Sequence, residues 1–171
     1  MTGGDHLRRA DERDHLVLPK YADVCAAAER LTGSAVRTPL LESPWLNERT
    51  GARLLIKAEP LQRTGSFKFR GAFNCISQID PRARALGVVA YSSGNHAQAV
   101  AAAARLHDIQ ATIVMPNDAP AVKVNGTRRY GADIVGYDRA TEIREEIAKH
   151  IAQEKGATLI RPYEDFNVIA G

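Results

Sequence analysis

From Gly87 onward, short apolar segments alternate with alanine-rich or amphipathic segments, and this alternation constrains the fold more than any other feature. The apolar segments predict strands at 88–91, 111–115, 133–135 and 158–160. The segments between them predict helices that begin near Asn95, Pro120 and Asp138, with Gly131 and Gly156 at the helix C-caps. Strands and helices that alternate with short connections form a parallel sheet covered by helices on both faces. We therefore predict a three-layer α/β fold, in which ligands bind beyond the carboxyl ends of the strands.

The segment before Gly87 is less regular. Pro19 and the apolar spacing that follows it predict a helix that ends at Gly33. A short helix is predicted at 43–50 and a short strand at 53–57. Residues 1–15 are expected to form a flexible tail, because the charged stretch within them has no apolar face.

The composition is that of an ordinary globular protein. The chain has 171 residues, of which 44% are hydrophobic and 25% are charged, and its 23 basic residues are interleaved with 20 acidic ones. This mixture argues against nucleic acid as a partner. The sequence contains neither an apolar run of roughly 18 residues nor a signal-peptide core, so we expect a cytoplasmic protein without a membrane partner. Cys25 and Cys75 are interpreted as buried small side chains, and no metal site is expected.

A lysine at the start of a predicted helix is the first candidate for chemistry. Ser66 is placed as the N-cap of a helix with an apolar stripe from Phe69 to Ile76. Lys68 then falls in the first turn, between Phe67 and Phe69. The positive end of the helix and the aromatic surroundings both lower the pKa of a lysine, which favours a nucleophile suited to Schiff-base chemistry. The alternative is a lysine that extends from a packed helix to solvent.

The turn after the predicted strand 88–91 is the second candidate. Its residues are Ser92, Ser93, Gly94, Asn95 and His96. Free backbone N–H groups at the start of a helix, two hydroxyls and a glycine form a cradle for a carboxylate or phosphate. The same residue types are also common in plain turns that cap a helix, and a histidine such as His96 more often packs than catalyses.

Together the two segments resemble the signature stretches of fold-type II pyridoxal-phosphate enzymes, which have the tryptophan synthase β-like fold. More narrowly, they resemble the branch of serine/threonine dehydratases (threonine ammonia-lyases) and serine racemases. The matching stretches are 38–40, 55–72, 92–98, 122–132, 161–165 and 168–171. The resemblance therefore covers the chain beyond its predicted tail, with the lysine and the serine–glycine–asparagine loop at the family's spacing.

The resemblance implies a role for each matched residue. Lys68 would form the Schiff base with pyridoxal 5′-phosphate and then act as base at the substrate's α-carbon, and Phe67 would pack beside the cofactor. Asn95 would hydrogen-bond the cofactor's 3′-oxygen. The loop of Ser92, Ser93, Gly94, Asn95 and His96 would receive the α-carboxylate of an amino acid. The implied reaction is β-elimination, in which L-serine or L-threonine gives a 2-oxo acid and ammonia, in a homo-oligomer, either dimer or tetramer.

Ser93 raises an alternative within the same branch. Threonine deaminases that resemble this sequence often have alanine at this position, whereas serine racemases have a serine that faces the substrate opposite the lysine. A hydroxyl there could protonate the α-carbon from the other face, which implies serine racemisation beside elimination. Ala97 replaces a glycine common in racemases and favours the dehydratases.

The resemblance also implies a division into lobes. Residues 16–83 would begin a large lobe, 84–161 would form a small α/β lobe, and 162–171 would begin the return to the large lobe. The family's phosphate-binding glycine loop and its partner for the pyridine nitrogen lie farther along such chains, so the second lobe is expected to be truncated. We expect uncovered strand edges and apolar surface. We also expect this chain alone neither to hold the cofactor tightly nor to turn over serine.

Interpretations from other classes remain open at this point. The loop 92–96 could bind an anionic metabolite in a non-catalytic α/β protein, which predicts that Lys68→Ala leaves binding intact. A β-replacement enzyme similar to cysteine synthase would use an equivalent lysine and a second nucleophile such as sulfide. A nicotinamide enzyme is disfavoured because no G-x-G-x-x-G follows a predicted strand.

Overall fold

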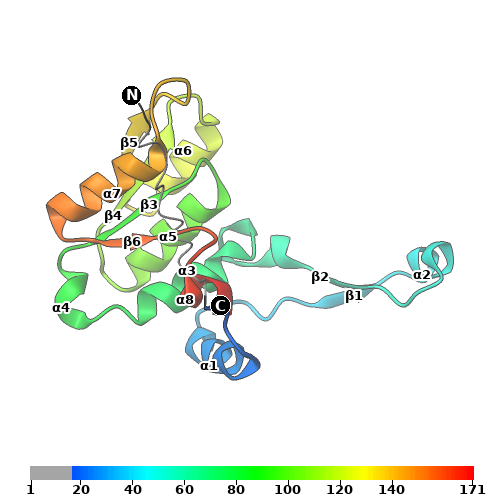
Figure 1. Cartoon of the computed structure of the whole chain (residues 1–171). Coiled ribbons are helices and arrows are strands. Elements are labelled where there is room, and N and C mark those ends of the chain that lie inside the picture. Colours follow the sequence, from blue (N-terminus) through cyan, green and yellow to red (C-terminus); the bar gives the residue numbers. More distant parts are fainter. Residues whose placement is uncertain (1–16) are drawn as a thin grey trace, which may run out of the picture.

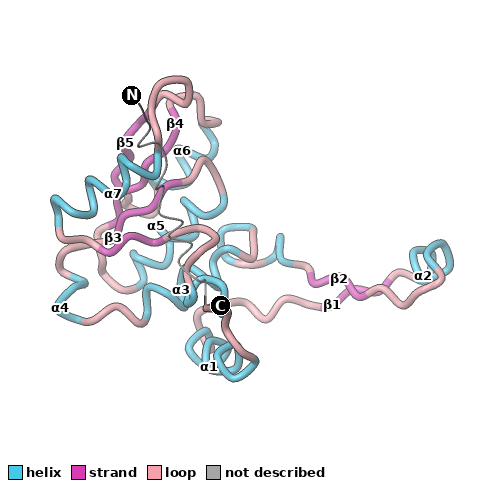
Figure 2. The backbone as a smooth tube through the Cα atoms, in the orientation of Figure 1, coloured by secondary structure: helices cyan, strands magenta, loops and turns pink. Residues whose placement is uncertain are grey.

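A four-stranded parallel sheet forms the centre of the computed structural model, which describes residues 17–171. The predicted tail, residues 1–15, lies outside this range. The strands are β3 (Val88–Tyr91), β4 (Ala111–Pro116), β5 (Asp133–Tyr137) and β6 (Thr158–Ile160). Their order is β5-β4-β3-β6, and all neighbouring pairs are parallel (Figures 1 and 2). The predicted strands and the parallel sheet are confirmed.

Helices cover both faces of this sheet. One face packs against α3 (Lys68–Ser77), α5 (Asn95–Leu106) and α6 (Ala121–Arg128), and the other against α7 (Arg144–Lys155). Side chains alternate accordingly, because Val88 and Ala90 join the core on the α5 side whereas Val89 and Tyr91 join the core on the α7 side. Strands buried on both faces have the continuous apolar sequence seen here. The predicted three-layer architecture is therefore confirmed.

The larger core is continuous from α3 into the sheet. Phe69 and Ile76 of α3 are fully buried and belong to the same apolar cluster as Val88 and Ile113. Two short helices complete this region, α4 (Pro81–Arg84) and α8 (Phe166–Ala170). Helix α8 lies against α3, which requires Gly71, because a β-carbon there would collide with the carbonyl oxygen of Val168. The division into lobes at residues 83 and 84 remains a prediction.

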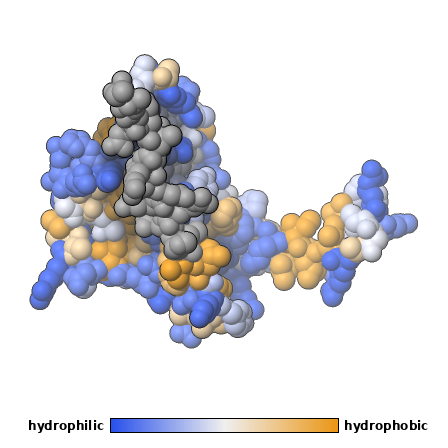
Figure 3. Space-filling model, in the orientation of Figure 1, coloured by the Kyte–Doolittle hydropathy of each residue, from blue (hydrophilic) through white to orange (hydrophobic). Residues whose placement is uncertain are grey.

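Part of the N-terminal segment, from β1 (Leu40–Glu42) to β2 (Leu55–Lys57), extends away from this body, whereas α1 (Tyr21–Leu31) packs against α3 and α8. After α1, the strands β1 and β2 form an antiparallel ribbon with α2 (Pro44–Thr50) at its tip (Figure 1). Two 3₁₀ turns, Glu59–Leu61 and Arg63–Gly65, lead from β2 to α3. The ribbon carries apolar side chains on both faces, and about half of each is exposed (Figure 3): Leu40, Leu41, Leu55 and Ile56. The expected uncovered apolar surface is confirmed.

Three local predictions are wrong. Ser66 is not the N-cap of α3, because Phe67 holds that position and Ser66 is extended one residue earlier. Helix α7 begins at Arg144 and not near Asp138, whose carboxylate accepts the N–H of Ala140 in a turn that replaces the first helical turn. Helix α6 ends before Gly131, which has a positive φ of 84° in the following turn, whereas Gly156 caps α7 as predicted.

Among residues 17–171, no helix is long and apolar enough to cross a membrane.

Candidate active site

The strand order places two loops together at one edge of the sheet. From β3 the chain moves outward through β4 to β5, and β6 then returns to the other side of β3. β3 and β6 are neighbouring strands, and the loops that follow them lead in different directions. Such a place is a topological switch point, where parallel sheets bind ligands. The loop after β3 contains Ser92 to His96, and the loop after β6 contains Pro162 and Tyr163.

Lys68, the first residue of α3, faces the loop that follows β6. Its Nζ donates a hydrogen bond to the carbonyl oxygen of Pro162 at 2.9 Å and lies 4.4 Å from the ring centroid of Tyr163. The Phe67 ring lies on another side, 5.3 Å from Nζ. Burial lowers the pKa of Lys68, in the predicted direction. The second aromatic neighbour, however, is Tyr163 and not Phe69, whose side chain points into the core.

Lys68 lines a cavity of about 350 Å³ between α3 and the return segment, residues 160–171, which run from the last residue of β6 through α8. Its lining residues are Phe67, Lys68, Arg70, Gly71, Pro162, Tyr163, Val168, Ile169 and Gly171. The predicted nucleophile is thus half-buried and adjacent to an open space. The alternative of a lysine that merely extends into solvent does not fit this contact with Pro162.

The loop after β3 leads into α5, whose N-terminus has no side-chain cap within residues 17–171. Gly94 is the N-cap of this 12-residue helix. The N–H of Gly94 donates to Oγ of Ser92 at 3.1 Å, while a β-carbon at Gly94 would meet nothing within 4 Å. Ser93 is half-buried and Asn95 is exposed. Uncapped N–H groups at the positive end of a helix and open space above them suit a carboxylate.

His96 joins this loop to the return segment. The side chain is only 3% exposed, and its Nε2 lies 3.2 Å from the carbonyl oxygen of Ile160. Because that partner can only accept, Nε2 carries the proton and Nδ1 is an acceptor, which finds no partner among residues 17–171. Burial lowers the pKa of His96 to about 4, so the ring is neutral near pH 7. His96 therefore positions the loop.

A known family has this combination of fold and lysine motif. Residues 31–171 match the family described as pyridoxal-phosphate dependent enzyme. This chain belongs to that family. Its α/β architecture is the family's fold-type II architecture.

Several relatives are similar over most of this chain. L-threo-3-hydroxyaspartate ammonia-lyase from a Pseudomonas species is 58% identical over 90% of this chain and 48% of its own length. Serine racemase from Schizosaccharomyces pombe is 46% identical over 92% of this chain and 49% of its own length. The structure of maize serine racemase has a TM-score of 0.85 at 39% identity, over 90% of this chain and 47% of that chain. The chain therefore spans about half the length of the relatives it matches.

The residues present fit the pyridoxal phosphate of this enzyme family on one side of the cofactor. Lys68 offers an amine with a lowered pKa at the edge of a cavity, and Phe67 borders the same cavity. The buried Oγ of Ser66, two residues before Lys68, has no hydrogen-bond partner in the described part of the chain. Asn95 adds an amide that can donate. These groups could hold a carbonyl cofactor, and that cofactor supplies the aldehyde for Schiff-base formation with a lysine.

Three groups at the site lie in stretches that match the family, but no role was predicted for any of them. They are the Pro162 carbonyl, the Tyr163 ring, and Lys123, whose Nζ donates to Oδ1 of Asn95 at 2.8 Å. Pro162 and Tyr163 follow a predicted strand, and the rule that sites form at strand carboxyl ends could have indicated them. Lys123 lies in α6, within the matching stretch 122–132, and that match could have indicated it.

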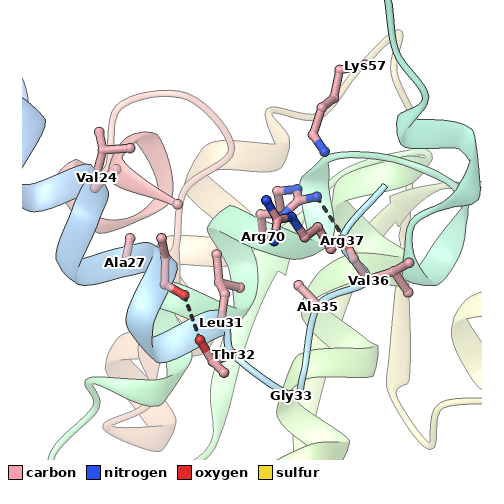
Figure 4. A pocket seen from close by; sticks show the side chains of 13 residues that line it. Val24, Ala27, Leu31, Thr32, Gly33, Ala35, Val36, Arg37, Lys57 and Arg70 are labelled. Carbon is pink, nitrogen blue, oxygen red and sulfur yellow. Dashed lines mark hydrogen bonds between the residues drawn. The ribbon is translucent and has the colours of Figure 1, made fainter. Parts of the chain in front are cut away.

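A second, larger cavity of about 670 Å³ lies beside α1 (Figure 4). One wall is apolar and includes Val24, Ala27 and Leu31, while Arg37, Lys57 and Arg70 line the opposite end. Arg70 pairs with Glu59 at 2.8 Å, and Lys57 donates to the Thr38 carbonyl. Two of its three cations thus already have partners.

The cysteines are not placed for catalysis. Cys75 is buried as predicted, and burial together with Asp165 raises the pKa of its thiol to about 12. Cys25 is only half-buried, which corrects the prediction that both cysteines are buried. Within residues 17–171, no three histidine, cysteine, aspartate or glutamate side chains come together as a metal site.

Proposed function

We propose that the protein containing this chain is a pyridoxal-phosphate dependent ammonia-lyase that eliminates water from a β-hydroxy amino acid. The observation that carries the proposal is the position of Lys68. This amine has a lowered pKa, lines a cavity, and contacts the same return segment as the loop after β3. A nucleophilic amine beside an open helix N-terminus suits an amino-acid substrate with an α-carboxylate.

Lys68 has two tasks in this reaction. Pyridoxal phosphate, when bound, supplies an aldehyde and a conjugated ring that withdraws electrons from the substrate's α-carbon. Nζ of Lys68 would first act as the nucleophile that bonds to that aldehyde, which requires it to leave the Pro162 carbonyl. The substrate's amine would then take its place and release Nζ as a free amine. Nζ then takes the proton from the α-carbon as a general base, and its lowered pKa favours the neutral amine needed for both tasks.

The loop after β3 binds and orients the substrate. The uncapped N–H groups at the start of α5 and the Ser92 and Ser93 hydroxyls receive the α-carboxylate. Asn95 would donate to the cofactor's 3′-oxygen, and Phe67, which lines the same cavity as Lys68, would pack beside the ring. His96 holds the loop against Ile160, so that the carboxylate site keeps a fixed distance from the return segment.

The substrate class follows from the leaving group. Loss of the α-proton and the β-hydroxyl as water, followed by hydrolysis, converts a β-hydroxy amino acid into a 2-oxo acid and ammonia. We propose L-threo-3-hydroxyaspartate, L-serine and L-threonine as substrates. The first is supported by relatives named L-threo-3-hydroxyaspartate ammonia-lyase, at 58% and 50% identity, and the others by relatives named serine racemase and threonine deaminase.

The experiment is an assay of 2-oxo acid and ammonia, with the protein expressed from its complete reading frame. L-threo-3-hydroxyaspartate, L-serine, L-threonine and D-serine are supplied separately with pyridoxal phosphate. We expect a 2-oxo acid from at least one L-substrate and none after Lys68→Ala. Amino-acid binding that Lys68→Ala leaves intact, with no 2-oxo acid from either protein, would instead support a non-catalytic metabolite-binding protein.

Serine racemisation is a second candidate, favoured by Ser93. This serine lies half-buried in the loop after β3, and a relative named serine racemase is 46% identical to the chain. Its hydroxyl would deliver a proton to the α-carbon on the face opposite Lys68. We further propose that the enzyme acts as a cytoplasmic homo-oligomer, with the boundary between its lobes near residues 83 and 84.

A further inference from the structure

Asn95 and Lys123 form a contact between two helices at the edge of the site. Asn95 is the first residue of α5, and Lys123 lies in the first turn of α6. Nζ of Lys123 is 2.8 Å from Oδ1 of Asn95. The two helices pack on the same face of the sheet.

This contact determines which way the Asn95 amide points. An asparagine side chain can present either its oxygen or its NH₂ group to a given neighbour, and only its hydrogen-bond partners decide between them. The ammonium of Lys123 can donate but cannot accept. Oδ1 must therefore face Lys123, and Nδ2 presents its N–H groups away from it.

Helix stability does not account for the placement of Lys123. A positive charge in the first turn of a helix lies at the positive end of the helix dipole, where it is unfavourable. Replacing Lys123 should therefore leave α6 folded. The contact with Asn95 gives this lysine a local role that packing does not.

We propose that Lys123 is a positioning residue that orients the Asn95 amide so that Nδ2 donates to the 3′-oxygen of the cofactor. This inference rests on the proposed function, which gives Asn95 that partner. Without Lys123, the amide could rotate and present Oδ1 to an anionic oxygen, which would repel it. Lys123 acts through Asn95 and does not itself touch the cofactor.

The test is a double-mutant cycle on the dissociation constant of pyridoxal phosphate, measured by equilibrium dialysis with the protein from its complete reading frame. The variants are Lys123→Met, Lys123→Arg, Asn95→Ala and the double variant Asn95→Ala/Lys123→Met. Lys149→Met, on the exposed face of α7, is the matched control. NMR signals of the side-chain amides in ¹⁵N-asparagine-labelled samples of the same proteins report the orientation of the Asn95 amide in the absence of cofactor.

We expect Lys123→Met to raise the dissociation constant about tenfold, as for loss of a hydrogen bond to a charged group, and Lys123→Arg to restore it. In the Asn95→Ala background, Lys123→Met should have no further effect. An equal effect in both backgrounds, or none in either, would overturn the inference. If the parent protein does not bind pyridoxal phosphate, the proposed function fails. In that case, unchanged Asn95 amide signals in Lys123→Met would separately refute the positioning role, and shifted signals would support it.

Discussion

Lys68 and His96 hydrogen-bond to carbonyl oxygens on one short backbone segment. Nζ of Lys68 lies 2.9 Å from the oxygen of Pro162, and Nε2 of His96 lies 3.2 Å from the oxygen of Ile160. The backbone from the last residue of β6 to Pro162 thereby joins the start of α3 to the start of α5. A change in this segment should affect the nucleophile and the substrate loop together.

His96 should make stability depend on pH. Burial lowers its pKa from the ordinary 6.5 to about 4, so only the unfolded state takes up a proton between these values. The stability that the neutral His96 ring contributes is therefore complete above its pKa in the unfolded state. It is lost as the pH falls toward its pKa in the folded state. From about pH 7 to about pH 4.5, this should lower the free energy of unfolding by about 2 kcal/mol. Urea unfolding at both pH values measures this difference in the free energy of unfolding.

His96→Gln is the informative variant, because its amide can still donate to Ile160. Between about pH 7 and about pH 4.5, this variant should lose about 2 kcal/mol less stability than the parent, because it lacks the titration of His96. His150→Gln, at an exposed position on α7, should keep the loss seen in the parent. A His96→Gln protein with the same pH dependence as the parent would show that the histidine is not buried in neutral form.

Gly71 should be required for the packing of α8 on α3. A β-carbon at Gly71 would collide with the backbone oxygen of Val168, so Gly71→Ala should destabilise the protein by about 1–3 kcal/mol. Gly126→Ala is the matched control, because its β-carbon would meet only the mobile end of Gln98. Its effect should stay within about 1 kcal/mol. Equal thermal unfolding of the two variants would contradict the close contact between α3 and α8.

Ser93 should separate racemisation from elimination. If its hydroxyl protonates the α-carbon, Ser93→Ala should lower D-serine formation by about a hundredfold or more and retain elimination. Ser92→Ala removes the acceptor of the Gly94 N–H and should lower both activities by a similar factor. Chiral chromatography and a 2-oxo acid assay on the same samples give the ratio. No D-serine above background in the parent, or undiminished racemisation in Ser93→Ala, would remove Ser93 from this role.

Local sequence patterns predicted the parts of the fold that depend on local physics. The short apolar runs at 88–91 and 111–115 predicted buried strands of a covered sheet, and β3 and β4 lie there. The prediction that Lys68 lies in the first turn of α3 is confirmed, although Phe67 and not Ser66 is the N-cap. The Asp138 prediction failed because its side chain satisfies the backbone within a turn and so competes with helix formation.

The parts that could not be predicted depend on distant contacts. Lys68 and Pro162 are 94 residues apart, and they meet only because β6 returns beside β3. No local pattern encodes that return, so the Pro162 carbonyl and the Tyr163 ring were not expected near Lys68. Lys123 likewise reaches Asn95 only because α5 and α6 share one face of the sheet.

The most direct test identifies the residue that bonds to the cofactor. The protein from its complete reading frame is mixed with pyridoxal phosphate, reduced with borohydride, and mapped by peptide mass spectrometry. A covalent pyridoxyl adduct should form on Lys68, disappear in Lys68→Ala, and persist in Lys57→Ala, which removes another lysine that donates to a backbone carbonyl. An adduct on a different lysine, or an undiminished adduct in Lys68→Ala, would contradict the assignment of Lys68 as the nucleophile.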